Sequence, residues 1–314
     1  MSNTNEFSRR DFIKKSSVAG LAAVTLPNMD FINSLEINEK FQVGATFILW
    51  GYNLKNLETS LEEMSRLGFH SFETFGWTIQ ELEDSGVRLE ELIEKHNIPI
   101  RSAFCMTDVL DPSPSKRKEE IEKLTSWTKL LKRAGGTLVE YCPASVDRKD
   151  FVFKEHRKNM VDAMNDYAKV VTDLGLTCAL HPHTGTPVET EEEVYFIMEN
   201  VDTNYMKFGP DSGQLEKGGA DTVKIFRDFM PLIEHVHLKD YEGGDNGYLG
   251  YAPLGEGHVK IKKLMKMLER GRDKMVGDIM FELDYDRKIK PAYSTFEAAK
   301  ISRDYLVDLG YSFT

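Results

Sequence analysis

The stretch HVHLKD, residues 235–240, indicates how this chain is organised. It follows an apolar run, as expected for a strand that leaves the interior of a protein. Because side chains alternate along a strand, His235, His237 and Lys239 point to one face and the intervening aliphatic residues to the other. Two imidazoles and an ammonium backed by aliphatic side chains predict the polar end of a buried strand.

Three further apolar runs end in potential metal ligands: CALHPH at 178–183, KFGPD at 207–211 and DIMFE at 278–282. In the first run, His181 and His183 share a face. The other two runs end in Asp211 and Glu282. Four strand ends of this kind are not typical of a solvated surface, and they predict a common site.

From residue 41 onward, short apolar runs alternate with amphipathic segments. We expect strands at residues 41–51, 69–75, 98–106, 137–143, 176–183, 205–211, 233–240 and 278–283. We expect helices at residues 54–67, 78–96, 118–134, 153–174, 190–200, 220–229, 259–270 and 294–309. This alternation predicts an α/β fold, a single (β/α)8 TIM barrel. A doubly wound open sheet is the alternative, but no glycine-rich nucleotide loop follows the first strand.

The composition excludes some classes of partner. The 314 residues include 41% apolar and 29% charged residues, which is ordinary for a globular protein, and the formal net charge is −11. A protein that binds a phosphate backbone needs a basic surface, so we expect no nucleic-acid partner. The composition is compatible with a small neutral or cationic ligand.

The N-terminal segment has the pattern of an export signal. The sequence SRRDFIK at residues 8–14 contains a twin-arginine pair, and a weakly apolar stretch follows at 18–27. This order predicts a bacterial export signal and a periplasmic location; a disordered basic N-terminus is the alternative. The stretch is too short for a stable membrane anchor. We therefore divide the chain into residues 1–40, signal and linker, and 41–314, the catalytic barrel.

In a barrel of parallel strands, polar residues at the strand ends meet at one mouth. The predicted ligands end four successive strands: His181, Asp211, His237 and Glu282. Mixed nitrogen and carboxylate ligands suit one divalent ion, with Mn²⁺ favoured and Co²⁺, Fe²⁺ or Zn²⁺ as alternatives. We therefore predict a metal centre at the mouth.

Other residues at the mouth are candidates for acid–base chemistry. Glu140 ends the fourth expected strand and is a candidate general base, with a structural salt bridge as the alternative. Glu282 and His183 are further catalytic candidates. Lys239 is a candidate for neutralising an enolate or contacting a sugar hydroxyl.

Four residues are candidates for substrate binding. His235 could contact substrate or orient a metal ligand, and Glu73 could face substrate or fix a loop. Trp50 and Trp77 follow the first two expected strands and could form an apolar wall for a sugar ring. Core packing is the equal alternative for both tryptophans.

The HVHLKD stretch, with GPDSG at 209–213 upstream and Phe281-Glu282 downstream, resembles the xylose-isomerase-like TIM-barrel superfamily. Members of this superfamily include sugar epimerases, hydroxypyruvate isomerase and inosose dehydratase. The resemblance covers roughly residues 41–310. The HPHTGT segment at 181–186 is similar to the inosose-dehydratase-like branch.

The resemblance implies metal ligands at Asp211, His237 and Glu282, with His181 as the fourth. Many epimerases of the superfamily have a glutamate at that fourth position, so this chain departs from their pattern there. In those enzymes a pair of glutamates moves the proton, and only Glu282 matches the pair here. Glu140 or His183 would have to be the partner in an epimerisation.

The sequence therefore predicts a metal-dependent sugar isomerase or epimerase that abstracts a proton alpha to a carbonyl through an enediolate. A lyase or dehydratase acting on a keto-sugar, inosose or 3-keto-glycoside shares the first step and is the alternative. A non-catalytic sugar-binding barrel is a third possibility. The expected ligand is a small sugar or cyclic polyol, and a homo-oligomer is possible.

Overall fold

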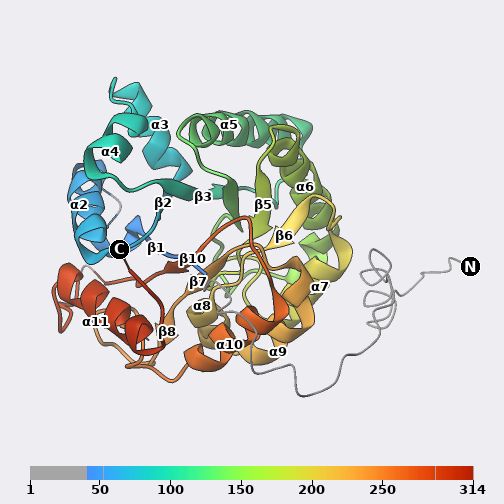
Figure 1. Cartoon of the computed structure of the whole chain (residues 1–314). Helices are drawn as coiled ribbons and strands as arrows, with labels where there is room; N and C mark the ends of the chain where they lie inside the picture. The colour runs from blue at the N-terminus through green and yellow to red at the C-terminus, as the bar shows by residue number, and fades with distance from the viewer. Residues whose placement is uncertain (1–40, 52, 287, 314) are drawn as a thin grey trace, which may run out of the picture. The chain divides into compact units, whose positions relative to one another are not determined.

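Eight parallel strands form the centre of the fold in the computed structural model (Figure 1). The structure describes residues 41–51, 53–286 and 288–313. The predicted export signal and the boundary at residue 40 lie outside these residues. The strands are β1 Val43–Thr46, β2 Phe72–Phe75, β3 Ile100–Thr107, β4 Leu138–Pro143, β5 Thr177–Leu180, β6 Met206–Phe208, β7 Val236–Leu238 and β10 Ile279–Phe281.

The strand order is β6-β5-β4-β3-β2-β1-β10-β7, and every neighbouring pair is parallel. Two further parallel bridges, Phe208 to Ile233 and Asp211 to His237, join the end of β6 to the chain around β7. These bridges close the sheet into a barrel. The predicted (β/α)8 architecture is confirmed.

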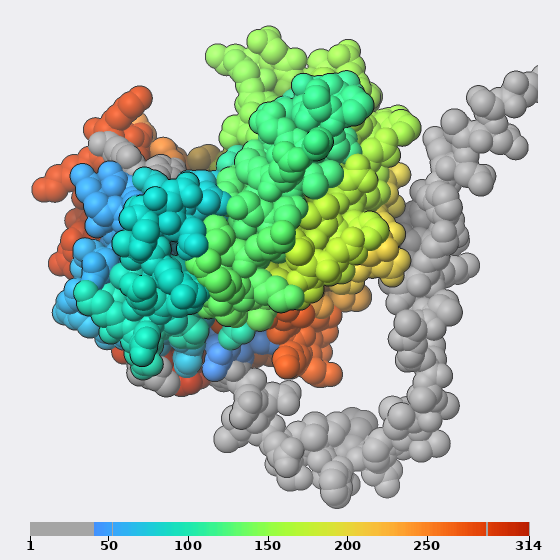
Figure 2. All heavy atoms as spheres, turned by 90° about the horizontal axis from the view of Figure 1, so that it is seen from above, coloured from blue at the N-terminus to red at the C-terminus, as the bar shows by residue number. Residues whose placement is uncertain are grey.

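Helices cover the outside of the strands, and their buried faces follow the helical period. They are α2 Leu57–Leu67, α3 Gly76–Asp84, α4 Leu89–His96, α5 Pro114–Arg133, α6 Phe153–Asp173, α7 Glu191–Asn200, α8 Ser212–Lys217, α9 Thr222–Phe229, α10 Ile261–Gly271 and α11 Thr295–Asp308. On one side α3, α4 and α5 form a continuous outer layer (Figure 2). Among the described residues, no helix is long and apolar enough to cross a membrane.

Two expected elements differ in detail from the structure. The first expected strand, residues 41–51, is extended only over Val43–Thr46 and continues as a 3-10 helix at Phe47–Trp50. The expected helix at 78–96 is divided into α3 and α4, with Gly86 between them at a φ of 82°. A positive φ interrupts a right-handed helix and suits glycine.

The loop after β7 contains a two-stranded hairpin, β8 Asp240–Tyr241 and β9 Tyr251–Ala252. Asp240 holds this loop, because its carboxylate accepts hydrogen bonds from the backbone N–H groups of Gly255, Gly257 and Val259. The loop is thereby tied to the end of β7, which carries the predicted site.

Candidate metal centre and active-site cavity

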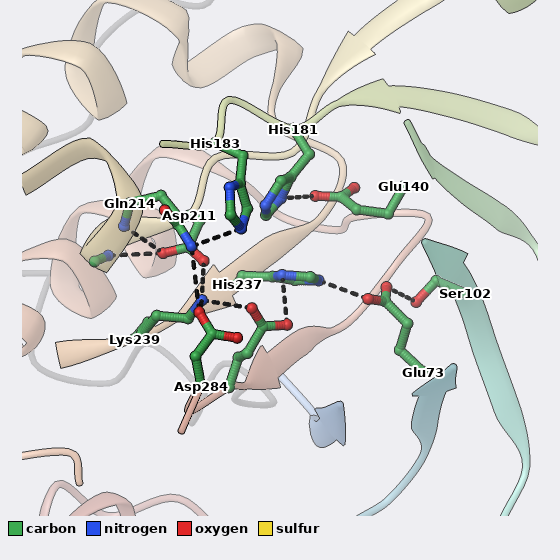
Figure 3. A network of polar contacts seen from close by, with 12 residues as sticks. Glu73, Ser102, Glu140, His181, His183, Asp211, Gln214, His237, Lys239 and Asp284 are labelled. Atoms are coloured by element: carbon green, nitrogen blue, oxygen red, sulfur yellow. Dashed lines mark hydrogen bonds and ion pairs between the residues drawn. The ribbon is translucent and has the colours of Figure 1, made fainter. Parts of the chain in front are cut away.

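Asp211 begins α8, and its position there determines which of its oxygens faces the site. Its Oδ1 accepts the backbone N–H groups of Gly213 at 2.7 Å and Gln214 at 2.8 Å, as a helix N-cap does. These bonds fix the side chain and direct Oδ2 toward the barrel mouth (Figure 3). The local helix start therefore presents one carboxylate oxygen to the centre.

His237, on β7, lies between two carboxylates. Its Nδ1 is 3.0 Å from Oε2 of Glu282, and its Nε2 is 2.9 Å from Oε1 of Glu73 (Figure 3). Ligand atoms of Asp211, His237 and Glu282 lie within 4.8 Å of one another. The structure thus brings three of the four predicted ligands into one compact buried group.

His181, the fourth predicted ligand, lies beside this group. Its ring centroid is 4.6 Å from that of His237, and its Nδ1 is 2.8 Å from Oε1 of Glu140. Ligand atoms of Glu140, His181 and His237 form a second group within 4.8 Å. His237 belongs to both groups and connects His181 to the other two predicted ligands, Asp211 and Glu282.

The donor atoms fit a divalent ion. His181 Nε2 and Glu140 Oε2 are buried and have no hydrogen-bond partner within the described part of the chain. Buried polar atoms are normally paired, so unpaired atoms at one place indicate an additional group. Two imidazoles and two carboxylates are the ligands that Mn²⁺, Fe²⁺, Co²⁺ and Zn²⁺ accept.

Lys239 supplies positive charge to the same carboxylates. Its fully buried Nζ lies 3.0 Å from Asp211 Oδ2, 2.6 Å from Glu282 Oε1 and 2.8 Å from Asp284 Oδ2. Burial alone would lower the pKa of Lys239, but the carboxylates of Asp211, Asp284 and Glu282 hold this pKa well above its ordinary value. Lys239 is therefore a permanent cation.

The neighbouring charges also set the protonation of the other groups. Burial alone would raise the pKa of Glu282, but His237 and Lys239 hold that pKa well below its usual range. Burial, followed by the positive charge of His237, lowers the pKa of the His181 imidazole. Glu282 is therefore ionised and His181 neutral, which are the forms that bind metal.

A cavity of about 210 Å³ opens next to this centre. Its lining comes from the ends of six strands and consists of Thr46, Phe47, Ile48, Glu73, Thr74, Phe75, Trp77, Phe104, Met106, Ser145, His183, Glu282 and Asp284. The lining contains three carboxylates and, within the described residues, no lysine or arginine. These groups suit a neutral polar molecule better than an anion.

The two sides of the cavity differ in chemistry. The ends of β1, β2 and β3 supply an aromatic arc of Phe47, Phe75, Trp77 and Phe104, in which Phe75 and Trp77 stack at 4.6 Å. On the other side, after β5 and β10, the lining consists of His183, Glu282 and Asp284. Lys239 and His237 contact these carboxylates without lining the cavity. We call this second side the polar arc.

His183 lines the cavity but uses both ring nitrogens in a closed set of hydrogen bonds. Its Nδ1 is 2.7 Å from the carbonyl of Thr184, and its Nε2 is 2.8 Å from Nε2 of Gln214. Gln214 Oε1 accepts the backbone N–H of Thr184 at 3.1 Å. A carbonyl only accepts, so Nδ1 of His183 carries the proton and Nε2 accepts from Gln214.

The remaining predicted residues take different positions. Glu140 is fully buried behind His181 and is absent from the cavity lining, whereas Glu73 is part of it. His235 is buried below the mouth, 3.1 Å from Glu73. Trp77 lines the cavity, but Trp50 lies outside the lining and donates its Nε1–H to another carboxylate at 2.6 Å.

Sequence reasoning missed Asp284 and Gln214. Asp284 follows Glu282 by two residues in an extended segment, so alternation alone would have placed both on one face. Gln214 carried no comparable signal, because it lies in the first turn of a short helix. Gln214 contacts His183 and Asp284, which are distant from it in the sequence, and these contacts form only when the chain folds.

Known proteins share the fold and part of the sequence of this chain. An inosose dehydratase from Geobacillus kaustophilus is 27% identical over 192 residues, which are 57% of this chain and 60% of that protein, less than two thirds of its length. A D-allulose 3-epimerase from Methylomonas sp., in complex with D-allulose, shares the fold with a TM-score of 0.68 at 18% identity, covering 87% of this chain and 98% of that one.

The IOLI protein with a bound zinc atom shares the fold with a TM-score of 0.66 at 19% identity, covering 85% of this chain and 97% of that one. The pattern of the xylose isomerase-like TIM barrel family matches residues 61–303. That match spans most of the barrel, including all four predicted metal ligands. The chain therefore belongs to the xylose isomerase-like TIM barrel family.

Proposed function

We propose that this protein is a divalent-metal-dependent dehydratase acting on a neutral keto-sugar or keto-polyol. The enzyme removes a proton alpha to the carbonyl and expels a hydroxyl from the next carbon as water. The division of the cavity into an aromatic arc and a polar arc is the observation that carries this proposal. The sequence similarity to an inosose dehydratase supports the same choice.

A sugar ring that stacks on the aromatic arc turns its other face toward the polar arc. The polar arc offers Glu282 and Asp284. The third carboxylate of the lining, Glu73 on β2, has its oxygens engaged by Ser102, His235 and His237, so proton transfers occur on one face of the ring. A syn elimination needs groups on one face, because one carboxylate takes the proton and returns it to the leaving hydroxyl. An epimerisation, the first prediction from the sequence, needs proton-transferring groups on both faces.

Asp211, His237, Glu282 and His181 would hold the ion. When bound, the ion polarises the substrate carbonyl and stabilises negative charge on its oxygen. Lys239 adds a fixed positive charge beside the same carboxylates. These residues make the alpha proton more acidic without taking part in its removal.

We assign proton removal to Asp284. Glu282 has both oxygens engaged, by His237 and Lys239. Asp284 lines the cavity, and Lys239 and Gln214 both contact its Oδ2. Asp284 takes the alpha proton, the C–H electron pair forms the new double bond, and the C–O bond of the β-hydroxyl breaks. The same proton then passes from Asp284 to the departing hydroxyl, which leaves as water.

The test is incubation of the full chain, loaded with Mn²⁺, Co²⁺ or Zn²⁺, with inososes, ketoses and 3-keto-glycosides in D₂O. Proton NMR follows exchange alpha to the carbonyl, and ultraviolet absorbance follows the conjugated enone. Loss of water with growth of the enone is the expected result. A rearranged sugar carrying deuterium would instead identify an isomerase or epimerase, and binding without exchange would identify a sugar-binding barrel.

A further inference from the structure

The His237 ring is held from both sides by carboxylates that come from β10 and β2, two strands with only β1 between them. Glu282, after β10, faces Nδ1 at 3.0 Å, and Glu73, on β2, faces Nε2 at 2.9 Å (Figure 3). Glu282, which faces Nδ1, forms one group of possible ligand atoms with Asp211 and His237, whereas Glu73 belongs to a separate group with His235 and His237. The carboxylate on the Nε2 side therefore has a different task from the one on the Nδ1 side.

Glu73 is itself held in place. Its Oε2 accepts the hydroxyl of Ser102 at 2.6 Å and lies 3.1 Å from Nε2 of His235. This leaves Oε1 for His237. The Glu73 side chain is only 2% exposed, and its three partners are Ser102 on β3, His237 on β7 and His235 just before β7.

A neutral imidazole has one N–H group and one lone pair on its two nitrogens. A carboxylate only accepts hydrogen bonds, so Glu73 and Glu282 each offer an acceptor to one ring nitrogen of His237. When an ion takes the place of a proton at Nδ1, the remaining N–H is at Nε2, where Glu73 accepts it. The lone pair of His237 is then at Nδ1, on the side of Glu282. The opposite tautomer would turn an N–H toward the centre and leave it unable to bind a cation.

We propose that Glu73 is a positioning residue that fixes the tautomer and orientation of His237, so that Nδ1 is presented to the divalent ion. Ser102 supports Glu73 in this task. The inference rests on the metal centre of the proposed function and adds to it a residue that does not bind the ion. Metal-bound histidines commonly donate their other N–H to a carboxylate in this way.

The same arrangement recurs at His181 with the two ring nitrogens exchanged. Glu140 Oε1 lies 2.8 Å from Nδ1 of His181, and an N–H donated from Nδ1 to an ionised Glu140 leaves the lone pair at Nε2. That Nε2 is the buried atom without a hydrogen-bond partner in the described chain. Two buried carboxylates, Glu73 and Glu140, thus each orient one imidazole toward the same centre.

The experiment measures Co²⁺ binding to the full chain and three variants, by titration of the visible Co²⁺ absorption bands. Glu73→Gln keeps the size and one acceptor oxygen but loses the charge, and Ser102→Ala removes only the support of Glu73. Glu63→Gln is the matched control, because Glu63 accepts an aromatic N–H from Trp50 outside the cavity. Circular dichroism checks that each variant is folded.

We expect Glu73→Gln to weaken Co²⁺ binding by about 10–100-fold and to change the absorption bands. Ser102→Ala should give a smaller loss in the same direction, and Glu63→Gln should match wild type. If wild type binds no Co²⁺, the metal centre of the proposed function is wrong. If wild type binds Co²⁺ and folded Glu73→Gln binds it equally with unchanged bands, the positioning role is wrong. Should Glu73→Gln fail to fold, unchanged Co²⁺ binding by Ser102→Ala would overturn the proposal.

Discussion

The ammonium of Lys239 lies 2.6 Å from Oε1 of Glu282, and neither group has more than slight access to solvent. The same ammonium contacts Asp211 and Asp284, so one buried cation serves three carboxylates. Removal of one partner from a buried ion pair costs about 3–5 kcal/mol, because the remaining charge stays buried without compensation. The stability of the mouth therefore depends on Lys239.

We predict that Lys239→Met lowers the free energy of unfolding by about 3–5 kcal/mol in the presence of a chelator. Saturating Zn²⁺ or Mn²⁺ should restore part of this loss, because a divalent ion replaces the missing positive charge. Thermal unfolding with and without metal measures both effects. Lys262→Met, at an exposed position on α10, is the control and should unfold like wild type. Equal unfolding of Lys239→Met and wild type under chelation would contradict the prediction.

Asp284→Asn should lower kcat by about 10²–10⁴-fold, since the amide cannot take the alpha proton. Its Co²⁺ binding should stay close to that of wild type, because the contacts of Asp284 within the described residues are with Lys239 and Gln214, which are not predicted ligands. For Glu140→Gln we expect the opposite: the variant should first weaken Co²⁺ binding, and any loss of kcat should follow from that. Full activity of Asp284→Asn would assign proton removal to another group.

Gly209 lies against the carboxylate of Glu140, so the two positions should be coupled. A Cβ atom at residue 209 would stand 2.3 Å from Oε2 of Glu140, which is shorter than any allowed contact. We predict that Gly209→Ala costs about 1–3 kcal/mol of stability, as overpacking does, and that it weakens Co²⁺ binding by displacing His181.

Urea unfolding of a double-mutant cycle tests the coupling. Combined with Glu140→Ala, the Gly209→Ala substitution should cost less than it does alone, because the clashing carboxylate is gone. Gly136→Ala, which would place a Cβ 2.2 Å from Leu131 far from this pair, supplies the control that should remain additive with Glu140→Ala. Strict additivity of Gly209→Ala and Glu140→Ala would show that the predicted contact does not determine the cost.

The sequence predicted the barrel because its apolar residues recur at regular spacings over most of the chain. The spacing is two residues in the strands and about 3.6 residues in the helices. Alternation in HVHLKD also placed His237 and Lys239 on one face, and both are at the barrel mouth. The parallel arrangement then brought together residues from β5, β6, β7 and β10 that are far apart in sequence. Residue type and strand position were therefore sufficient to predict which residues gather at the barrel mouth.

The sequence could not predict which group each ligand candidate contacts. His183 and His181 lie two residues apart in the sequence. His183 forms hydrogen bonds with Thr184 and Gln214, whereas the ring of His181 packs against that of His237. Likewise, Lys239 contacts Asp284, a residue 45 positions away. Such partners depend on side-chain orientation at the mouth, which periodicity does not encode.

We propose that the N-terminal segment directs export to the periplasm, and the arginine pair provides the test. Replacement of Arg9 and Arg10 by lysine keeps the charge but removes the planar guanidinium groups, and Lys does not substitute for Arg where that geometry is recognised. Fractionation of a bacterial host, followed by immunoblotting, should find wild type in the periplasm and the double variant in the cytoplasm. Arg66→Lys, the same chemical change on α2, should be exported like wild type. A double variant that reaches the periplasm in wild-type amounts would show that the arginine pair is not the signal.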